Sequence, residues 1–282
     1  MARPLRIQYE GAFYHITARG NEKKDIFTNG ADRNRFVKIL ESVAEKYRWI
    51  VHAYCLMSNH YHLVVETPLK NLSAGMRQLN GVYTQSFNKK HGRIGHLFQG
   101  RFKAYLIEKE NHLLEVCRYI VLNPVRAGII HDPFEWEYSS YRKTFGDRKR
   151  YKYLYPDLIL SFFSNSLADA QKGYIKYVKE GIGKENPFKD AHGGFILGGE
   201  KFVKSVLEND KNIDCEEIAK RERYASRPNL RDIFAGKERD EGIIIAINRW
   251  RYSLEDVSNF VGLHYSWVSR IAKKQKTRPD PH

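Results

Sequence analysis

The amino-acid sequence predicts an α+β fold in which helices cover an antiparallel sheet. Short segments rich in aromatic and β-branched residues alternate with longer segments whose apolar residues recur every three or four positions. In addition, 42% of the 282 residues are hydrophobic and 13% are aromatic, which is enough for a substantial core and for more than one domain. The expected order is strand, helix, strand, strand, helix, strand, helix.

The first elements follow from composition and spacing. Residues 12–18 are short, aromatic and β-branched and precede the turn Arg19-Gly20-Asn21, so they are expected to form a strand. Residues 31–47 are expected to form an amphipathic helix with an apolar side at Phe36, Ile39, Leu40, Val43 and Ala44. Residues 49–57 and 60–67 are expected to form a β-hairpin, because Ser58-Asn59 between them favours a tight turn.

The later elements complete a ferredoxin-like arrangement. A second helix is expected at 69–89 and a fourth strand at 101–108. Asn111 is expected to cap a third helix that ends near Leu122, because Pro124 disfavours helical geometry at Asn123. This order is typical of an antiparallel sheet with helices stacked against it.

The third strand carries two histidines one residue apart. Side chains alternate faces along a strand, so His60 and His62 point the same way while Tyr61, Leu63 and Val65 face a core behind them. Two adjacent imidazoles can share a divalent metal. A lone histidine in such a strand is more often a half-buried structural residue, and for this pair both interpretations stay open.

The third helix has a polar stripe beside its apolar one. Glu115, Tyr119 and Asn123 recur every four residues, apart from the apolar positions Leu113, Cys117, Ile120 and Val121. Tyr119 offers a nucleophilic hydroxyl, and the amide oxygen of Asn123 could complete a metal site with the two histidines. On spacing alone, an ordinary tyrosine of an amphipathic helix is the better interpretation.

The charge balance favours a polyanionic partner. Lys and Arg total 48 against 33 Asp and Glu, a formal net charge of +15, and nucleic acid is the commonest partner of such a chain. A soluble protein that is merely basic is the alternative. The sequence contains no long apolar span that would predict a membrane segment.

The three cysteines, Cys55, Cys117 and Cys215, lack the spacing of metal ligands or of a disulfide framework. The N-terminus lacks the apolar core of a signal peptide, so a cytoplasmic location is expected.

The C-terminal stretch has the pattern of a helix-turn-helix. One helix is expected to begin near Ser253, Gly262 to make the turn, and a second helix to start around Tyr265. The second helix would direct toward a major groove the residues Tyr265, Ser266, Ser269, Arg270 and Lys273. The basic residues of 273–278 would contact phosphates. A short helical hairpin without a DNA-binding role is the alternative.

Several motifs together resemble a known family. Asn59-His60-Tyr61-His62 and the later run Arg118-Tyr119-Ile120-Val121-Leu122-Asn123-Pro124-Val125-Arg126-Ala127-Gly128 resemble the single-tyrosine HUH transposases, above all the REP-associated tyrosine transposases. The segments 14–21 and 96–102 are also similar to the pattern of that family. The resemblance covers roughly the first half of the chain in the order of the family.

The resemblance implies a mechanism. His60 and His62 would be the HUH ligands of Mg²⁺ or Mn²⁺, with Asn123 as a third ligand. Tyr119 would attack a phosphodiester of single-stranded DNA and leave a 5′-phosphotyrosine and a free 3′-hydroxyl, and a second 3′-hydroxyl could reverse the step. Mg²⁺ prefers oxygen ligands, so a two-histidine site indicates tolerance of Mn²⁺. The base that deprotonates Tyr119 stays open between Glu115, water and a substrate oxygen.

The expected organisation has three parts: a HUH nuclease domain at 1–145, a helical and linker region at 146–240, and a helix-turn-helix module with a basic tail at 241–282. The middle part shows no recognisable chemistry. Expected partners are single-stranded or hairpin DNA, and double-stranded DNA through the C-terminal module, with association to the nucleoid. Candidate DNA contacts in the first part are Arg19, Asn21, Arg101 and Arg126.

Two alternatives remain beside a mobile strand transferase. One is a domesticated nickase of repeated hairpins that does not mobilise itself, and the other is a DNA-binding regulator with an inactive HUH domain. The presence of all four expected active-site residues argues against the regulator. The sequence leaves open the DNA sequence that is bound and the choice between monomer and dimer.

Overall fold

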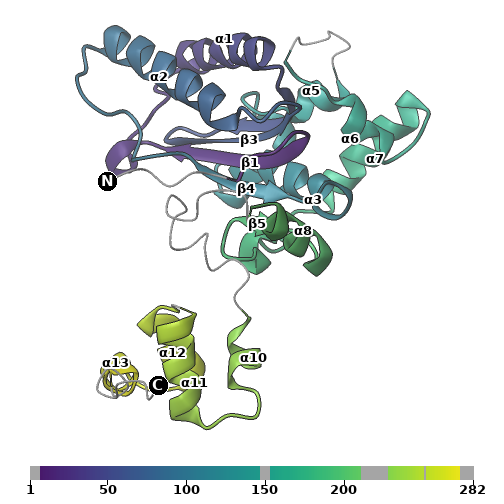
Figure 1. Cartoon of the computed structure of the whole chain (residues 1–282). Helices are drawn as coiled ribbons and strands as arrows, with labels where there is room; N and C mark the ends of the chain where they lie inside the picture. The colour runs from purple at the N-terminus through teal and green to yellow at the C-terminus, as the bar shows by residue number, and fades with distance from the viewer. Residues whose placement is uncertain (1–6, 147–152, 211–227, 251, 274–282) are drawn as a thin grey trace.

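A computed structural model describes residues 7–146, 153–210, 228–250 and 252–273. Its sheet contains β1 (Ala12–Arg19), β2 (Ile50–Leu56), β3 (His60–Thr67), β4 (Lys103–Ile107) and β5 (Ile196–Leu197) in the order β2-β3-β1-β4-β5 (Figure 1). The first four strands pair antiparallel, as the sequence predicts, and β2 and β3 form the expected hairpin. The two-residue β5 pairs parallel with β4 and was not expected.

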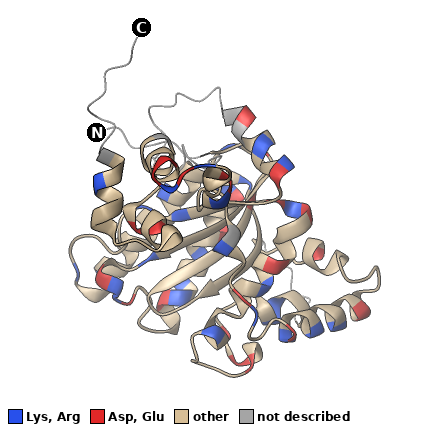
Figure 2. Ribbon diagram, turned by 90° about the horizontal axis from the view of Figure 1, so that it is seen from below, with Lys and Arg blue, Asp and Glu red and all other residues tan. Residues whose placement is uncertain are grey.

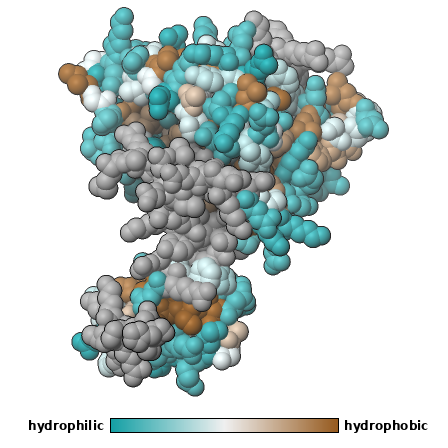
Figure 3. All heavy atoms as spheres, in the orientation of Figure 1, coloured by the Kyte–Doolittle hydropathy of each residue, from teal (hydrophilic) through white to brown (hydrophobic). Residues whose placement is uncertain are grey.

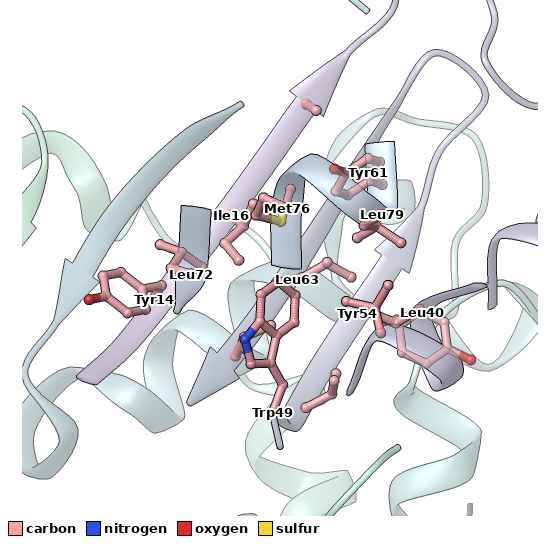
Figure 4. Packing of buried hydrophobic residues seen from close by; sticks show 14 of the residues in the cluster. Tyr14, Ile16, Leu40, Trp49, Tyr54, Tyr61, Leu63, Leu72, Met76 and Leu79 are labelled. Carbon is pink, nitrogen blue, oxygen red and sulfur yellow. The ribbon is translucent and has the colours of Figure 1, made fainter. Parts of the chain in front are cut away.

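Two helices cover one face of the sheet. They are α1 (Gly30–Tyr47) and α2 (Leu72–His91), close to the ranges predicted from their apolar spacing. Asn29 caps α1 by accepting the backbone N–H of Asp32 at 3.1 Å. Tyr61, Leu63 and Met76 are buried in the core between these helices and the sheet (Figure 4). The residues between the histidines of β3 therefore face this core, as alternation along a strand requires.

The opposite face of the sheet packs against α3 (Lys109–Val121), which is followed by the short helix α4 (Asn123–Arg126). The buried stripe of α3 includes Leu113, Cys117 and Ile120, as predicted. The prediction that Asn111 caps this helix is wrong. The chain becomes helical directly after β4, so Glu108 is the N-cap residue, and its carboxylate accepts the backbone N–H of Gly199 at 2.9 Å.

The middle of the chain packs on both cores. It comprises η2 (Pro133–Glu135), α5 (Tyr141–Phe145), α6 (Asp157–Ser161), α7 (Leu167–Lys179), η3 (Pro187–Asp190) and α8 (Glu200–Asp210), whereas the short turn η1 (Asn21–Lys23) directly follows β1. Tyr153 and Val203 join the core under α1 and α2, whereas Ile159 and Tyr174 join the core under α3. Residues 153–206 thus contribute to the same cores as the first half, and the predicted domain boundaries stay a prediction.

The last described helices have a core of their own. They are α10 (Leu230–Phe234), α11 (Arg239–Ile244), the π-helical turn η5 (Ile245–Arg249), α12 (Leu254–Val261) and α13 (Tyr265–Lys273). Ser253 caps α12, and Gly262 ends it with a left-handed φ of 68°. These bounds match the predicted ones. Among the described residues, no helix is long and apolar enough to cross a membrane. Cys215 and the basic tail 274–278 lie outside the described residues.

Candidate functional site

His60 and His62 lie on the face of β3 that packs toward α3. Their imidazole centroids are 5.0 Å apart, and in the register of the sheet they lie opposite Arg19 and Thr17 of β1. His60 is half-buried, whereas His62 is 8% exposed. The alternation predicted from the sequence therefore places both rings side by side.

The hydrogen bonds of His60 fix the roles of its two nitrogens. Its Nδ1 lies 2.6 Å from Oδ1 of Asn59, an oxygen that can only accept, so His60 Nδ1 carries the proton. The amide nitrogen of Asn59 donates to the carbonyl of Lys23 at 3.0 Å, which supports this orientation of the amide. The lone pair of His60 is then on Nε2.

His62 is oriented by a third histidine. Its Nδ1 lies 2.9 Å from Nε2 of His15 in β1, and the two rings are stacked with centroids 5.1 Å apart. The Nε2 of His62 is buried and has no hydrogen-bond partner among the described residues. A buried, unpartnered imidazole nitrogen is costly unless a ligand binds it. In metal-binding histidines, the ring nitrogen that does not bind the metal is usually hydrogen-bonded. Nδ1 of His62 has such a partner in His15, so Nε2 of His62 fits a metal ligand.

All three histidines are neutral at neutral pH. Burial lowers the pKa of His15 to about 3. Burial, with a smaller contribution from Arg19, lowers the pKa of His60 to about 4. Burial and the two neighbouring histidines hold the pKa of His62 well below its ordinary value. Neutral imidazole is the form that binds metals, so the site is ready for a cation without a pH change.

The buried His15 is expected to make the free energy of unfolding depend on pH. Its pKa is 6.5 ordinarily and about 3 when folded, so between these values the unfolded chain binds a proton that the folded chain does not. The contribution of a buried neutral histidine to the free energy of unfolding is therefore fully present above pH 6.5. It falls as the pH drops, by up to about 1.4 kcal/mol per pH unit for each such histidine.

Denaturant unfolding between pH 7 and pH 5, in EDTA, measures this dependence. The slope against pH is expected to be shallower in His15→Gln than in the unsubstituted chain, since the glutamine does not titrate. Equal slopes would show that His15 takes up its proton as readily in the folded chain as in the unfolded one.

Tyr119 lies on α3 and is half-buried. Burial raises the pKa of its hydroxyl, while the guanidinium of Arg126 acts in the opposite direction. The Cζ of Arg126 is 4.9 Å from the centroid of the Tyr119 ring, and its Nη1 donates to the carbonyl of Lys184 at 2.5 Å. Arg126, expected as a DNA contact, thus also contacts the expected nucleophile.

One aromatic ring links Tyr119 to the histidines. Phe188 of η3 meets the ring of Tyr119 edge-on at 5.6 Å between centroids, and it stacks on His15 at 4.6 Å. It also packs on Tyr105 of β4 at 4.6 Å. Sequence reasoning missed both His15 and Phe188.

Asn123, the first residue of α4, and Glu115 of α3 have local partners. The amide nitrogen of Asn123 donates to the carbonyls of Tyr119 at 3.0 Å and Ile120 at 3.3 Å. The carboxylate of Glu115 lies 3.8 Å from the guanidinium of Arg118, and it adds to the effect of burial that raises the pKa of the neighbouring Tyr177. In the part of the chain that the structure describes, no group of three or more His, Cys, Asp or Glu is arranged to hold a metal.

The expected DNA contacts lie in different places. Arg19 is exposed beside His60, and the backbone N–H of Asn21 donates to the carbonyl of Leu97 at 2.9 Å. Arg101 lines a pocket with α2, on the sheet face opposite Arg126. Lys and Arg are spread over many elements rather than gathered on one (Figure 2), so net charge alone does not mark the site.

The expected contacts of the C-terminal part lie on α13. Tyr265 is 58% exposed and Arg270 is exposed, whereas Ser266 and Ser269 are half-buried. The side chain of Lys273 lies outside the described residues. Trp267, which the sequence reasoning passed over, is also 58% exposed and lies 5.5 Å from the guanidinium of Arg270. Figure 3 shows apolar surface, in brown, on the part that carries α10–α13.

Comparisons with known proteins agree with the motifs. Residues 8–123 match the family described as "Transposase IS200 like". A curated protein of Haemophilus influenzae, described as a REP-associated tyrosine transposase, is 26% identical over 121 residues, covering 39% of this chain and 69% of that protein. The resemblance to these transposases is therefore confirmed for this part of the chain.

Two solved structures also align. A REP-associated tyrosine transposase bound to a REP hairpin gives a TM-score of 0.45 with 17% identity, over 56% of this chain and 93% of the other. A tRNA(His) guanylyltransferase of Saccharomyces cerevisiae gives 0.33 with 10% identity, over 70% and 87%.

Proposed function

Since residues 8–123 match the IS200-like transposase family, we propose that the chain is a metal-dependent endonuclease and strand transferase of single-stranded DNA. Tyr119 would be the nucleophile and hairpin DNA the substrate. The observation that carries the proposal is the buried, unpartnered Nε2 of His62 in a cluster that Phe188 and His15 connect to Tyr119. A cation site and a nucleophilic hydroxyl that belong to one cluster of ring contacts are what such chemistry requires.

Residues His60 and His62 would hold the metal through their Nε2 atoms, with Mn²⁺ or Mg²⁺ as the ion. When bound, the ion would polarise the scissile phosphate and offset the charge that develops on its oxygens. Asn123 fits a third ligand only through its Oδ1, because its amide nitrogen is bonded to the helix backbone. His15 would hold the ring of His62 in place.

The chemistry of the chain centres on Tyr119. Its hydroxyl oxygen would form a bond to the phosphorus while the bond from phosphorus to the 3′-oxygen breaks, and the leaving oxygen takes up a proton to give a 3′-hydroxyl. The phenol proton leaves to solvent or to a substrate oxygen. Because one phosphoester bond replaces another, attack by a second 3′-hydroxyl can reverse the step without ATP.

Arg126 is expected to set the pH at which Tyr119 reacts. Its guanidinium lowers the pKa of the hydroxyl against the effect of burial, so Arg126→Gln should raise that pKa further. A rise of one unit costs about tenfold in phenolate at a fixed pH below the pKa. Rates of adduct formation between pH 6 and 10 should then shift to higher pH in the variant. A uniform loss at every pH would instead assign Arg126 to DNA binding alone.

The proposal is tested by incubating the chain with end-labelled single-stranded hairpin DNA and Mn²⁺ or Mg²⁺. A covalent protein–DNA adduct should run on a denaturing gel, and a released strand should carry a free 3′-hydroxyl. EDTA should abolish both products. If no adduct forms with any hairpin that carries single-stranded flanks, the assignment to strand transfer is wrong.

For the C-terminal part, the proposal is a helix-turn-helix that binds double-stranded DNA. The capped α12, the left-handed Gly262 and the exposed Arg270 of α13 support it. Arg270→Glu is expected to weaken binding to duplex DNA at least about tenfold, because a phosphate or base contact becomes repulsive. Binding to a single-stranded hairpin flank should stay unchanged. Unchanged affinity for every duplex tested would remove this role of α13.

A further inference from the structure

A pocket lies on the sheet face opposite Tyr119. Its volume is 640 Å³, within the roughly 300–1,000 Å³ of small-ligand sites. It is formed between one side of α2 and the segment that precedes β4. The lining residues that matter here are Arg77, Asn80, Gly81, Phe98, Arg101 and Phe102.

The lining combines aromatic, cationic and amide groups. Phe98 and Phe102 belong to the wall that packs on the core under α2, and Arg77 and Arg101 are exposed at the pocket. Oδ1 of Asn80 accepts the buried hydroxyl of Tyr61 at 2.6 Å, which fixes the amide and leaves its NH₂ group to donate. An aromatic wall for a base and guanidinium groups for a phosphate are what single-stranded nucleic acid requires.

Gly81 keeps one wall of this pocket open. It lies on α2, and no atom lies within 4 Å of the position that a Cβ would take there. A larger side chain at this position would enter the pocket without displacing protein atoms. Gly81 also weakens the helix relative to alanine, a cost that a longer side chain would avoid.

The pocket is joined to the histidine site by backbone hydrogen bonds. Gln99 N–H donates to the carbonyl of Arg19 at 2.8 Å, and Gly20 N–H donates to the carbonyl of Asn59 at 2.8 Å. Asn59 in turn accepts from His60. The turn after β1 therefore connects the segment that forms the pocket to the strand that carries the histidines, and it exposes Arg19 along that path.

We propose that this pocket binds one unpaired nucleotide of the single-stranded DNA that flanks the cleaved position. The base would pack on the aromatic wall and meet the amide of Asn80, while the guanidiniums of Arg77 and Arg101 would contact the adjoining phosphates. The strand would continue over the turn after β1 to His60. This assignment rests on the proposed function, since it takes single-stranded DNA as the substrate.

Binding of fluorescent DNA to the full chain in EDTA tests the pocket without cleavage. Gly81→Glu, which places a carboxylate in the pocket, is expected to weaken binding to a hairpin with single-stranded flanks by at least about tenfold, the size of one lost base-stacking contact. Ala74→Glu adds the same charge at an exposed position of α2 outside the pocket and should have little effect. A hairpin without flanks should bind all these chains equally.

A scan with single abasic positions identifies the nucleotide. One position in the flank should weaken binding to the unsubstituted chain but have no further effect on Gly81→Glu, because both changes remove the same contact. Equal affinity of Gly81→Glu and Ala74→Glu for flanked hairpins, or additive losses at every abasic position, would overturn the proposal. These assays need neither metal nor Tyr119. If the chain binds DNA in this pattern but forms no covalent adduct, the proposed function is refuted, whereas the assignment of the pocket to an unpaired nucleotide is retained.

Discussion

Tyr119→Phe is expected to abolish the covalent protein–DNA adduct, with a loss of roughly 10³-fold or more in the rate of strand cleavage. The substitution removes the one hydroxyl that α3 presents beside Arg126 and Phe188. The ring that packs edge-on against Phe188 remains, so the fold should be retained. Adduct formation is followed on a denaturing gel with labelled hairpin DNA and Mn²⁺.

Tyr155→Phe is the matched control for this loss. Tyr155 is 47% exposed and lies on the chain segment before α6, so removal of its hydroxyl should leave the rate unchanged. Thermal unfolding of both variants separates a chemical effect from a loss of fold. An undiminished adduct from Tyr119→Phe would remove Tyr119 as the nucleophile.

Alanine at both His60 and His62 is expected to eliminate metal binding together with cleavage. The two Nε2 atoms are the nitrogen ligands assigned to the cation, and without them the scissile phosphate loses its charge stabilisation, which we expect to cost at least about 10³-fold in rate. Mn²⁺ binding measured by calorimetry provides a readout that does not depend on activity. Tyr119→Phe should bind Mn²⁺ normally in the same experiment.

The single variants His60→Ala and His62→Ala distinguish the loss of a metal ligand from the loss of the fold. His62 is buried, so its removal leaves a cavity, whereas His60 is half-buried and His60→Ala should disturb the core less. His131→Ala, at an exposed position outside the site, is the control. A folded double variant that still binds Mn²⁺ and cleaves DNA would place the metal elsewhere.

Much of the first half of the fold could be predicted because local features determine it. The turn at Ser58-Asn59 and the alternation around Tyr61 fix the hairpin and the face on which the histidines lie. Apolar periodicity likewise placed α1, α2 and α3 close to their observed bounds. Alternation also put His62 beside His60 as a possible metal ligand, whereas spacing alone favoured an ordinary helix tyrosine at Tyr119, and only the family resemblance made it the candidate nucleophile.

The missing parts depend on pairing and on contacts distant in sequence. His15 joins the site only through the register of β1 with β3, which strand alternation alone does not give. Phe188 comes from a region without a recognisable motif, and β5 is too short to have one. Asn123 carries the expected amide, but its nitrogen bonds to the preceding turn of the helix, a choice that sequence spacing does not reveal.

Peptide mapping of the covalent adduct tests the central assignment most directly. The adduct formed with Mn²⁺ is digested with protease and nuclease, and mass spectrometry locates the modified residue. We expect a nucleotide joined through its 5′-phosphate to the peptide that contains Tyr119, and a free 3′-hydroxyl on the released strand. A nucleotide on any other residue, or a link through a 3′-phosphate, would contradict the account.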